Sequence, residues 1–83
     1  MKMQAKVISR FDENSKIKAI ITVTLEDCFV INGVKVIGSK DKGLYVAMPS
    51  HKVGDAYKDI CHPITSEMRK AISDVVMNAY EEN

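Results

Sequence analysis

Four side chains of this 83-residue chain could ligate a metal ion or act in nucleophilic catalysis: Cys28, His51, Cys61 and His62. Zinc is held tetrahedrally by sulfur and nitrogen ligands, but the spacing of these four residues matches no zinc finger or zinc ribbon. A cysteine nucleophile needs a base beside its sulfur, and neighbours in an extended segment, such as Cys61 and His62, point to opposite sides. We therefore expect no metal, no cofactor and no catalytic residue, and hence a protein that is not an enzyme.

The stretch that holds both histidines, "AMPSHKVGDAYKDICHPIT" (47–65), offers cations as a second kind of chemistry. The formal net charge of the whole chain is only +1, so no overall basic field indicates a polyanionic partner. The charge is nevertheless segregated, because residues 35–58 hold five lysines against two aspartates and the chain ends in the acidic "YEEN". Solvated loop lysines would give the same composition, so both interpretations stay open.

A basic edge is the functional interpretation of these cations. Cations gathered there would bind phosphates with an affinity that depends on salt more than on base sequence. Tyr45 and Tyr57 would add stacking on bases if they are exposed, although strand aromatics more often belong to a core. The candidate nucleic-acid-binding residues are Lys40, Lys42, His51, Lys52, Lys58, Arg69 and Lys70.

The first third of the chain is predicted to form two strands. The alternation of apolar and polar residues that is typical of a strand is clearest in "KIKAIITVTL" (16–25). Every second residue from Ile17 to Leu25 is apolar, and the lysines and threonines line most of the other face. The segment "AKVISRF" (5–11) precedes it across the turn residues "DENS" and completes a hairpin. The acidic pair Glu26-Asp27 marks a second reversal of the chain.

Two further strands are expected in the middle of the sequence. Asn32-Gly33 fits either a type I′ hairpin turn or a bend within one long strand over 29–37. After the polar loop "GSKDKG", the segment "LYVAM" (44–48) is another strand, which ends at Pro49 because proline has no N–H for a ladder. A basic loop and a short return strand then lead into "HPIT".

The last third changes to helical periodicity. Apolar residues recur at the spacing of one helix face from Met68 to Tyr80. Thr65 or Ser66 can cap the N-terminus with its side-chain oxygen. Before the cap, we expect His62 to donate to a backbone carbonyl and so to orient the chain. Cys28 and Cys61 are interpreted as small apolar side chains.

This order of elements predicts an α+β fold: an antiparallel β-sheet of four to five strands with one amphipathic C-terminal helix, in two layers. Its length suits a single domain over residues 1–83. One helix covers one face of a sheet, so we expect a homodimer formed through the sheet. No apolar run reaches transmembrane length and no signal-peptide pattern is present, which predicts a cytoplasmic protein with reduced thiols and no membrane partner.

Several longer motifs resemble the SpoVG family, bacterial proteins linked to septation and sporulation. They are "KAIITVTLEDCFVINGVKVI", "GLYVAMPS" and "YKDICHPIT", followed by an arginine in the helix, and they keep the family's order and spacing. The resemblance implies a small α+β protein that dimerises through its sheet and acts as a DNA-binding, and in some members RNA-binding, regulator. It also implies basic contacts at Lys52, Lys58 and Arg69.

His51 and the pair Lys70-Ala71 depart from the family pattern. A lysine is usual at position 51, and the pattern resembles Glu-Lys at positions 70 and 71, so the basic surface is expected to be shifted. With histidine at 51, we expect nucleic-acid binding to strengthen in mild acid. The competing hypothesis is a non-enzymatic protein-interaction module of the division or sporulation machinery, which docks through a sheet edge or helix face.

Overall fold

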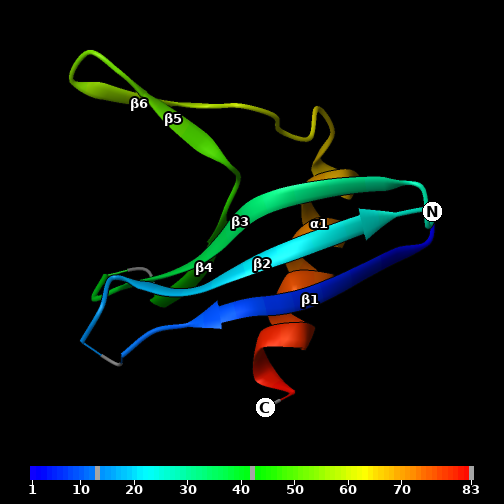
Figure 1. Cartoon of the computed structure of the whole chain (residues 1–83), viewed down its shortest axis with the longest axis horizontal. Coiled ribbons are helices and arrows are strands. Elements are labelled where there is room, and N and C mark those ends of the chain that lie inside the picture. The colour runs from blue at the N-terminus through cyan, green and yellow to red at the C-terminus, as the bar shows by residue number, and fades with distance from the viewer. Residues whose placement is uncertain (13, 42, 83) are drawn as a thin grey trace.

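The computed structural model describes residues 1–12, 14–41 and 43–82, which form two antiparallel sheets and one helix (Figure 1). The main sheet has the strand order β1-β2-β3-β4, and β5 and β6 form a separate two-stranded sheet. This confirms the α+β prediction. The elements are β1 (Met3–Arg10), β2 (Ile17–Leu25), β3 (Phe29–Ser39), β4 (Gly43–Ala47), β5 (Ser50–Val53), β6 (Ala56–Asp59) and α1 (Ser66–Glu81).

The core lies between the main sheet and α1, which crosses behind the strands in Figure 1. The alternation predicted for β2 holds, because Ala19, Ile21 and Val23 are 0% exposed. Burial of a side chain the size of Ile21 or Val23 stabilises the fold by about 1.5–3 kcal/mol, so this face of β2 contributes strongly to the packing of the sheet on the helix. The other core residues are Val34, Val36, Met48, Ile72 and Val76.

The predicted reversal at Glu26-Asp27 is a tight turn between β2 and β3. Both residues have positive φ, 53° and 55°, as the central residues of a type I′ turn do. The Cys28 N–H donates to the Leu25 carbonyl at 3.0 Å and closes the turn. The Cys28 side chain, interpreted from the sequence as a small apolar side chain, is exposed.

Asn32-Gly33 is a bend within one long strand, the second of the two alternatives left open by the sequence. Opposite β2, the register shifts at this point: Ile21 pairs with Val34, whereas Val23 pairs with Ile31. Gly33 takes φ 84°, a conformation that side-chain-bearing residues rarely adopt. The glycine therefore provides a β-bulge and not a hairpin turn.

Residues 50–59 form a β-hairpin that contacts no other strand or helix of the described chain. The sequence predicted a basic loop followed by a return strand here, and both halves are strands, paired from Ser50↔Asp59 to Val53↔Ala56. Gly54 turns the chain with φ 62° in a two-residue loop. Figure 1 shows the hairpin projecting away from the main sheet.

The lead into α1 is fixed by local hydrogen bonds and by a buried proline. Pro63 is buried, and Nδ1 of His62 lies 3.1 Å from the Pro63 carbonyl, to which an Nδ1–H donates. Thr65 is the N-cap, because its hydroxyl accepts from the Met68 N–H at 3.1 Å. Cys61 packs against the core, as expected. Among the described residues, no helix combines the length and apolar character that crossing a bilayer requires.

Arg10 ties the end of β1 to the C-terminal end of α1. Its guanidinium donates to the Tyr80 carbonyl at 3.0 Å and lies 5.1 Å from the centroid of the Tyr80 ring. A cation at this end complements the helix dipole, and its stacking on the ring adds a cation–π contact. The sequence places Phe11, which follows Arg10, on the same strand face as Ala5 and Val7, but its side chain is 46% exposed and lies outside the core.

Candidate nucleic-acid interface

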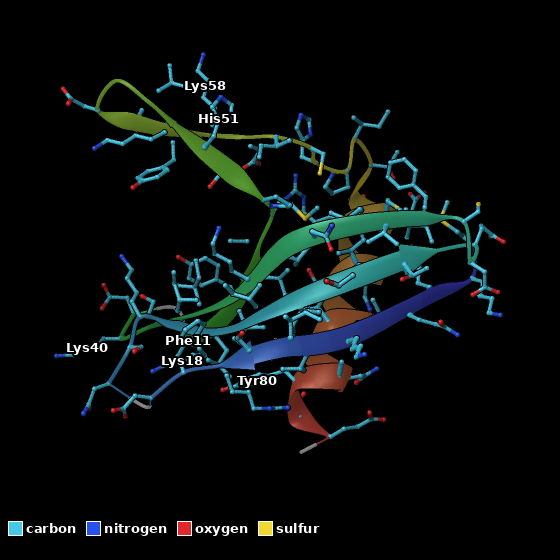
Figure 2. All side chains as sticks on the ribbon, in the orientation of Figure 1. Phe11, Lys18, Lys40, His51, Lys58 and Tyr80 are labelled. Atoms are coloured by element: carbon cyan, nitrogen blue, oxygen red, sulfur yellow. The ribbon has the colours of Figure 1, made fainter. Side chains whose placement is uncertain are left out.

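The β5–β6 hairpin brings two of the predicted site residues together and separates a third. His51 pairs with Lys58 across the strands, and Lys52 pairs with Tyr57. Because successive strand residues point to opposite faces, His51 and Lys58 share one face and Lys52 lies on the other. Figure 2 shows His51 and Lys58 side by side on the projecting hairpin.

The two faces of the hairpin differ in charge. The face of His51 and Lys58 carries no carboxylate from the paired positions, whereas the opposite face holds Asp59, diagonally across the strands from Lys52. Tyr57 on that opposite face is 70% exposed. The aromatic ring is therefore available for stacking rather than used in the core.

A second group of cations lies at the end of the main sheet, apart from the hairpin (Figure 2). A hollow of about 480 Å³ there is lined by Lys16, Lys18 and Lys40. The sequence predicted only Lys40, and placed Lys16 and Lys18 on the polar face of a regular strand. The strand is irregular, because the pairing of β2 with β3 shifts between Ile17 and Ala19. No pattern in the sequence marks this bulge.

The remaining predicted residues divide into three cases. Arg69 lines a hollow between α1 and β4 together with Tyr45, which is 39% exposed. Lys70 forms an exposed ion pair with Asp74, Nζ to Oδ2 3.0 Å, one helical turn ahead. Lys42 lies outside the described residues. The predicted residues therefore do not form one continuous edge.

The histidines and cysteines do not gather into a metal site in the described part of the chain. Residues 1–12, 14–41 and 43–82 contain no group of three His, Cys, Asp or Glu side chains placed to hold an ion. The remaining candidates for a functional role are the cations that have no carboxylate partner in that part of the chain. No ion pair links Lys40, Lys52 or Lys58 to another described residue, whereas Lys2 and Lys70 are each paired with an aspartate.

Comparison with known proteins agrees with the resemblance found in the sequence. The family model SpoVG matches residues 1–82. The chain belongs to the SpoVG family. The septation protein SpoVG of Clostridioides difficile strain 630 is 41% identical over 83 residues, which cover 99% of this chain and 89% of the relative.

Other SpoVG proteins match to a similar extent. That of Lachnoclostridium phytofermentans is 43% identical over 75 residues, 89% of this chain and 80% of the relative. That of Staphylococcus saprophyticus is 41% identical over 83 residues, 99% of this chain and 81% of the relative. These relatives are all named as septation proteins.

Proposed function

We propose that this SpoVG-family protein is a non-enzymatic, nucleic-acid-binding regulator that acts as a homodimer in the cytoplasm, in septation and sporulation. The observation that carries the proposal is the exposure of Lys40, Lys52 and Lys58 without an ion pair to any described residue. Exposed cations of this kind contribute little to folding. They are suited to neutralising phosphates, which DNA and RNA present alike.

The homodimer is supported by apolar surface that the single chain leaves uncovered. A hollow of about 290 Å³ at the base of the hairpin is lined mainly by apolar residues, among them Phe29, Val30 and Ile60. These three side chains are 62%, 52% and 64% exposed. An isolated two-stranded hairpin is marginally stable in water. A second copy that covers this patch would bury the apolar side chains and support the hairpin, and it would double the number of phosphate contacts.

The protein-interaction module is the second candidate, and the same apolar patch favours it. A partner from the division or sporulation machinery would then occupy the surface around Phe29 and Ile60 in place of a second copy. The two candidates differ in the role of the lysines, because a protein partner on the apolar patch does not require Lys40 or Lys58.

Fluorescence anisotropy separates the two. The purified protein is titrated into labelled duplex DNA, single-stranded DNA and RNA, each over a salt series. Nucleic-acid binding predicts saturable binding to at least one of them, with log K falling linearly as log salt rises. Absence of any anisotropy change at low salt, together with a stoichiometric protein partner on co-purification, would favour the interaction module.

A further inference from the structure

Strand β4 is the edge of the main sheet, and two hollows lie along it. One, of about 290 Å³, lies between β4 and α1 and has Arg69 and Tyr45 in its lining. The other, of about 480 Å³, holds Lys18 and Lys40. Leu44 lines both hollows, so they meet at this residue and follow one edge strand.

The cations of the two hollows lie toward opposite ends of β4, the lysines at one end and Arg69 at the other. The lining between them is apolar and consists of Leu44, Val46 and the core residue Met48. Leu44 is 45% exposed. An occupant that fits both features carries spaced negative charges joined by flat apolar groups. A single nucleic-acid strand has this character, because its bases are unstacked and its phosphates repeat at regular intervals.

Gly38 gives the lysine end a defined shape. A Cβ built on Gly38 would lie 2.6 Å from Cε of Lys18 and 3.6 Å from Cδ2 of Leu44. The Lys18 side chain thus lies directly over the backbone of β3 beside Leu44, in space that any other residue at 38 would fill. The bulge in β2 and the glycine in β3 together place this lysine at the hollow.

We propose that a single strand of DNA or RNA lies along β4, with its phosphates on Lys18, Lys40 and Arg69 and a base stacked on Tyr45. This inference rests on the proposed nucleic-acid-binding function and gives it a substrate class. Bases in a duplex are already stacked on one another, so Tyr45 cannot stack on them. The β4 edge therefore favours single strands over duplexes.

The test compares the affinity of the protein for a labelled single-stranded deoxythymidine oligonucleotide with its affinity for a duplex of the same length. A length of about 12 nucleotides lies within the usual range of single-strand sites. The Lys40→Gln, Arg69→Gln variant should lower the salt slope for the single strand by about 1.4, which is about 0.7 for each lost phosphate contact. Lys6→Gln is the matched control, because Lys6 is an exposed lysine on β1, at the opposite edge of the sheet. It should leave the slope unchanged.

Tyr45 tests the stacking. Tyr45→Leu keeps the apolar volume of the strand and should weaken single-strand binding about tenfold, within the range measured for lost base stacking. Tyr45→Phe keeps the ring and should bind like the unaltered protein. Gly38→Ala changes no charge but displaces Lys18, and should weaken single-strand binding with little loss of thermal stability.

Three results would overturn the β4 site. One is equal or tighter binding to the duplex. Another is an unchanged salt slope in Lys40→Gln, Arg69→Gln alongside a reduced slope in Lys58→Gln, which would place the contact on the hairpin and leave the proposed function standing. The third is displacement of the bound single strand by a poly-glutamate peptide of equal charge. That result would assign the two hollows along β4 to an acidic protein segment. Failure of the proposed function itself is distinct, because then no nucleic acid binds at any salt.

Discussion

His51 and Lys58 face each other as a cross-strand pair on one side of the β5–β6 hairpin. Both side chains are exposed, and no carboxylate occupies a paired position on their face. Side chains directly opposite each other on antiparallel strands lie close enough to contact the same group, and one phosphate can accept hydrogen bonds from both. The pair is therefore a candidate position for one phosphate.

Nucleic-acid affinity should therefore depend on the side chain at position 51. His51→Lys places a permanent cation opposite Lys58 and should tighten DNA binding in a fixed-salt titration, because it adds a phosphate contact. His51→Gln carries no charge and should bind no more tightly than the unaltered protein. Equal affinities of all three proteins would remove His51 from the contact.

The core prediction concerns Ile72, which is 3% exposed on the buried face of α1. Ile72→Ala should lower the free energy of unfolding by about 3 kcal/mol, because it removes buried methyl groups and leaves a cavity. Ile64 precedes the helix and is 89% exposed, so Ile64→Ala should change stability by less than about 0.5 kcal/mol. Urea unfolding of the two variants checks the difference, and equal losses would contradict the assigned core.

The β2–β3 turn offers a test of backbone strain at Glu26. With φ 53°, this residue sits in the left-handed region, where β-branched side chains are strongly disfavoured and glycine is not. The free energy of unfolding of the Glu26→Gly variant should therefore exceed that of the Glu26→Val variant by about 1–2 kcal/mol. Both substitutions lose the hydrogen bond from the Lys2 N–H to the Glu26 carboxylate, 2.9 Å, so this bond does not affect the comparison. Equal urea midpoints would rule out the positive φ.

Ile60 tests the proposed dimer. It lies at the base of the hairpin, in the apolar hollow, and is 64% exposed in the single chain. Ile60→Asp would place a charge in the covered surface and should convert the dimer to a monomer in sedimentation-velocity experiments. Ile64→Asp, outside the hollow, serves as the matched control. The dimer surface would be elsewhere if both variants sedimented like the unaltered protein.

The regular parts of the fold could be predicted because their burial follows a simple period. The buried residues Ala19, Ile21 and Val23 recur at every second position of β2, and Ile72 and Val76 are four residues apart on one helix face. Each pattern has one physical cause, which is one buried side of one element. The N-cap was predictable for the same reason, since Thr65 carries the oxygen that the first helical turn needs.

The irregular parts could not be predicted because long-range pairing decides them. Asn32-Gly33 suits a turn and a bulge equally well, and only the continued pairing of β3 along β2, as far as Ile37 opposite Ile17, selects the bulge. The register shift between β2 and β3 beside Lys18 is likewise decided by long-range strand pairing. Residues 50–59 bury none of their side chains on the main sheet, so no hydrophobic period indicated two strands there.

The sequence indicated the candidate residues one by one, but not how they are grouped in space. Lysines in polar segments are easily recognised, and Lys40, Lys52 and Lys58 are exposed as predicted. Their grouping depends on which face each one occupies. The sequence therefore suggested one basic edge, where the structure separates the hairpin from the β4 end of the sheet (Figure 2). The pairing of Lys70 with Asp74 is visible as an i, i+4 spacing and lowers the share of Lys70 in any phosphate contact.

The salt dependence of nucleic-acid binding tests the central claim most directly. Anisotropy titrations over a salt series should give a linear fall of log K with log salt for the unaltered protein. In the double variant Lys52→Ala, Arg69→Ala, binding should weaken and the slope should flatten by about 2. An unchanged slope in the double variant would remove these two residues from the site, and no binding by the unaltered protein at low salt would contradict nucleic-acid binding as its function.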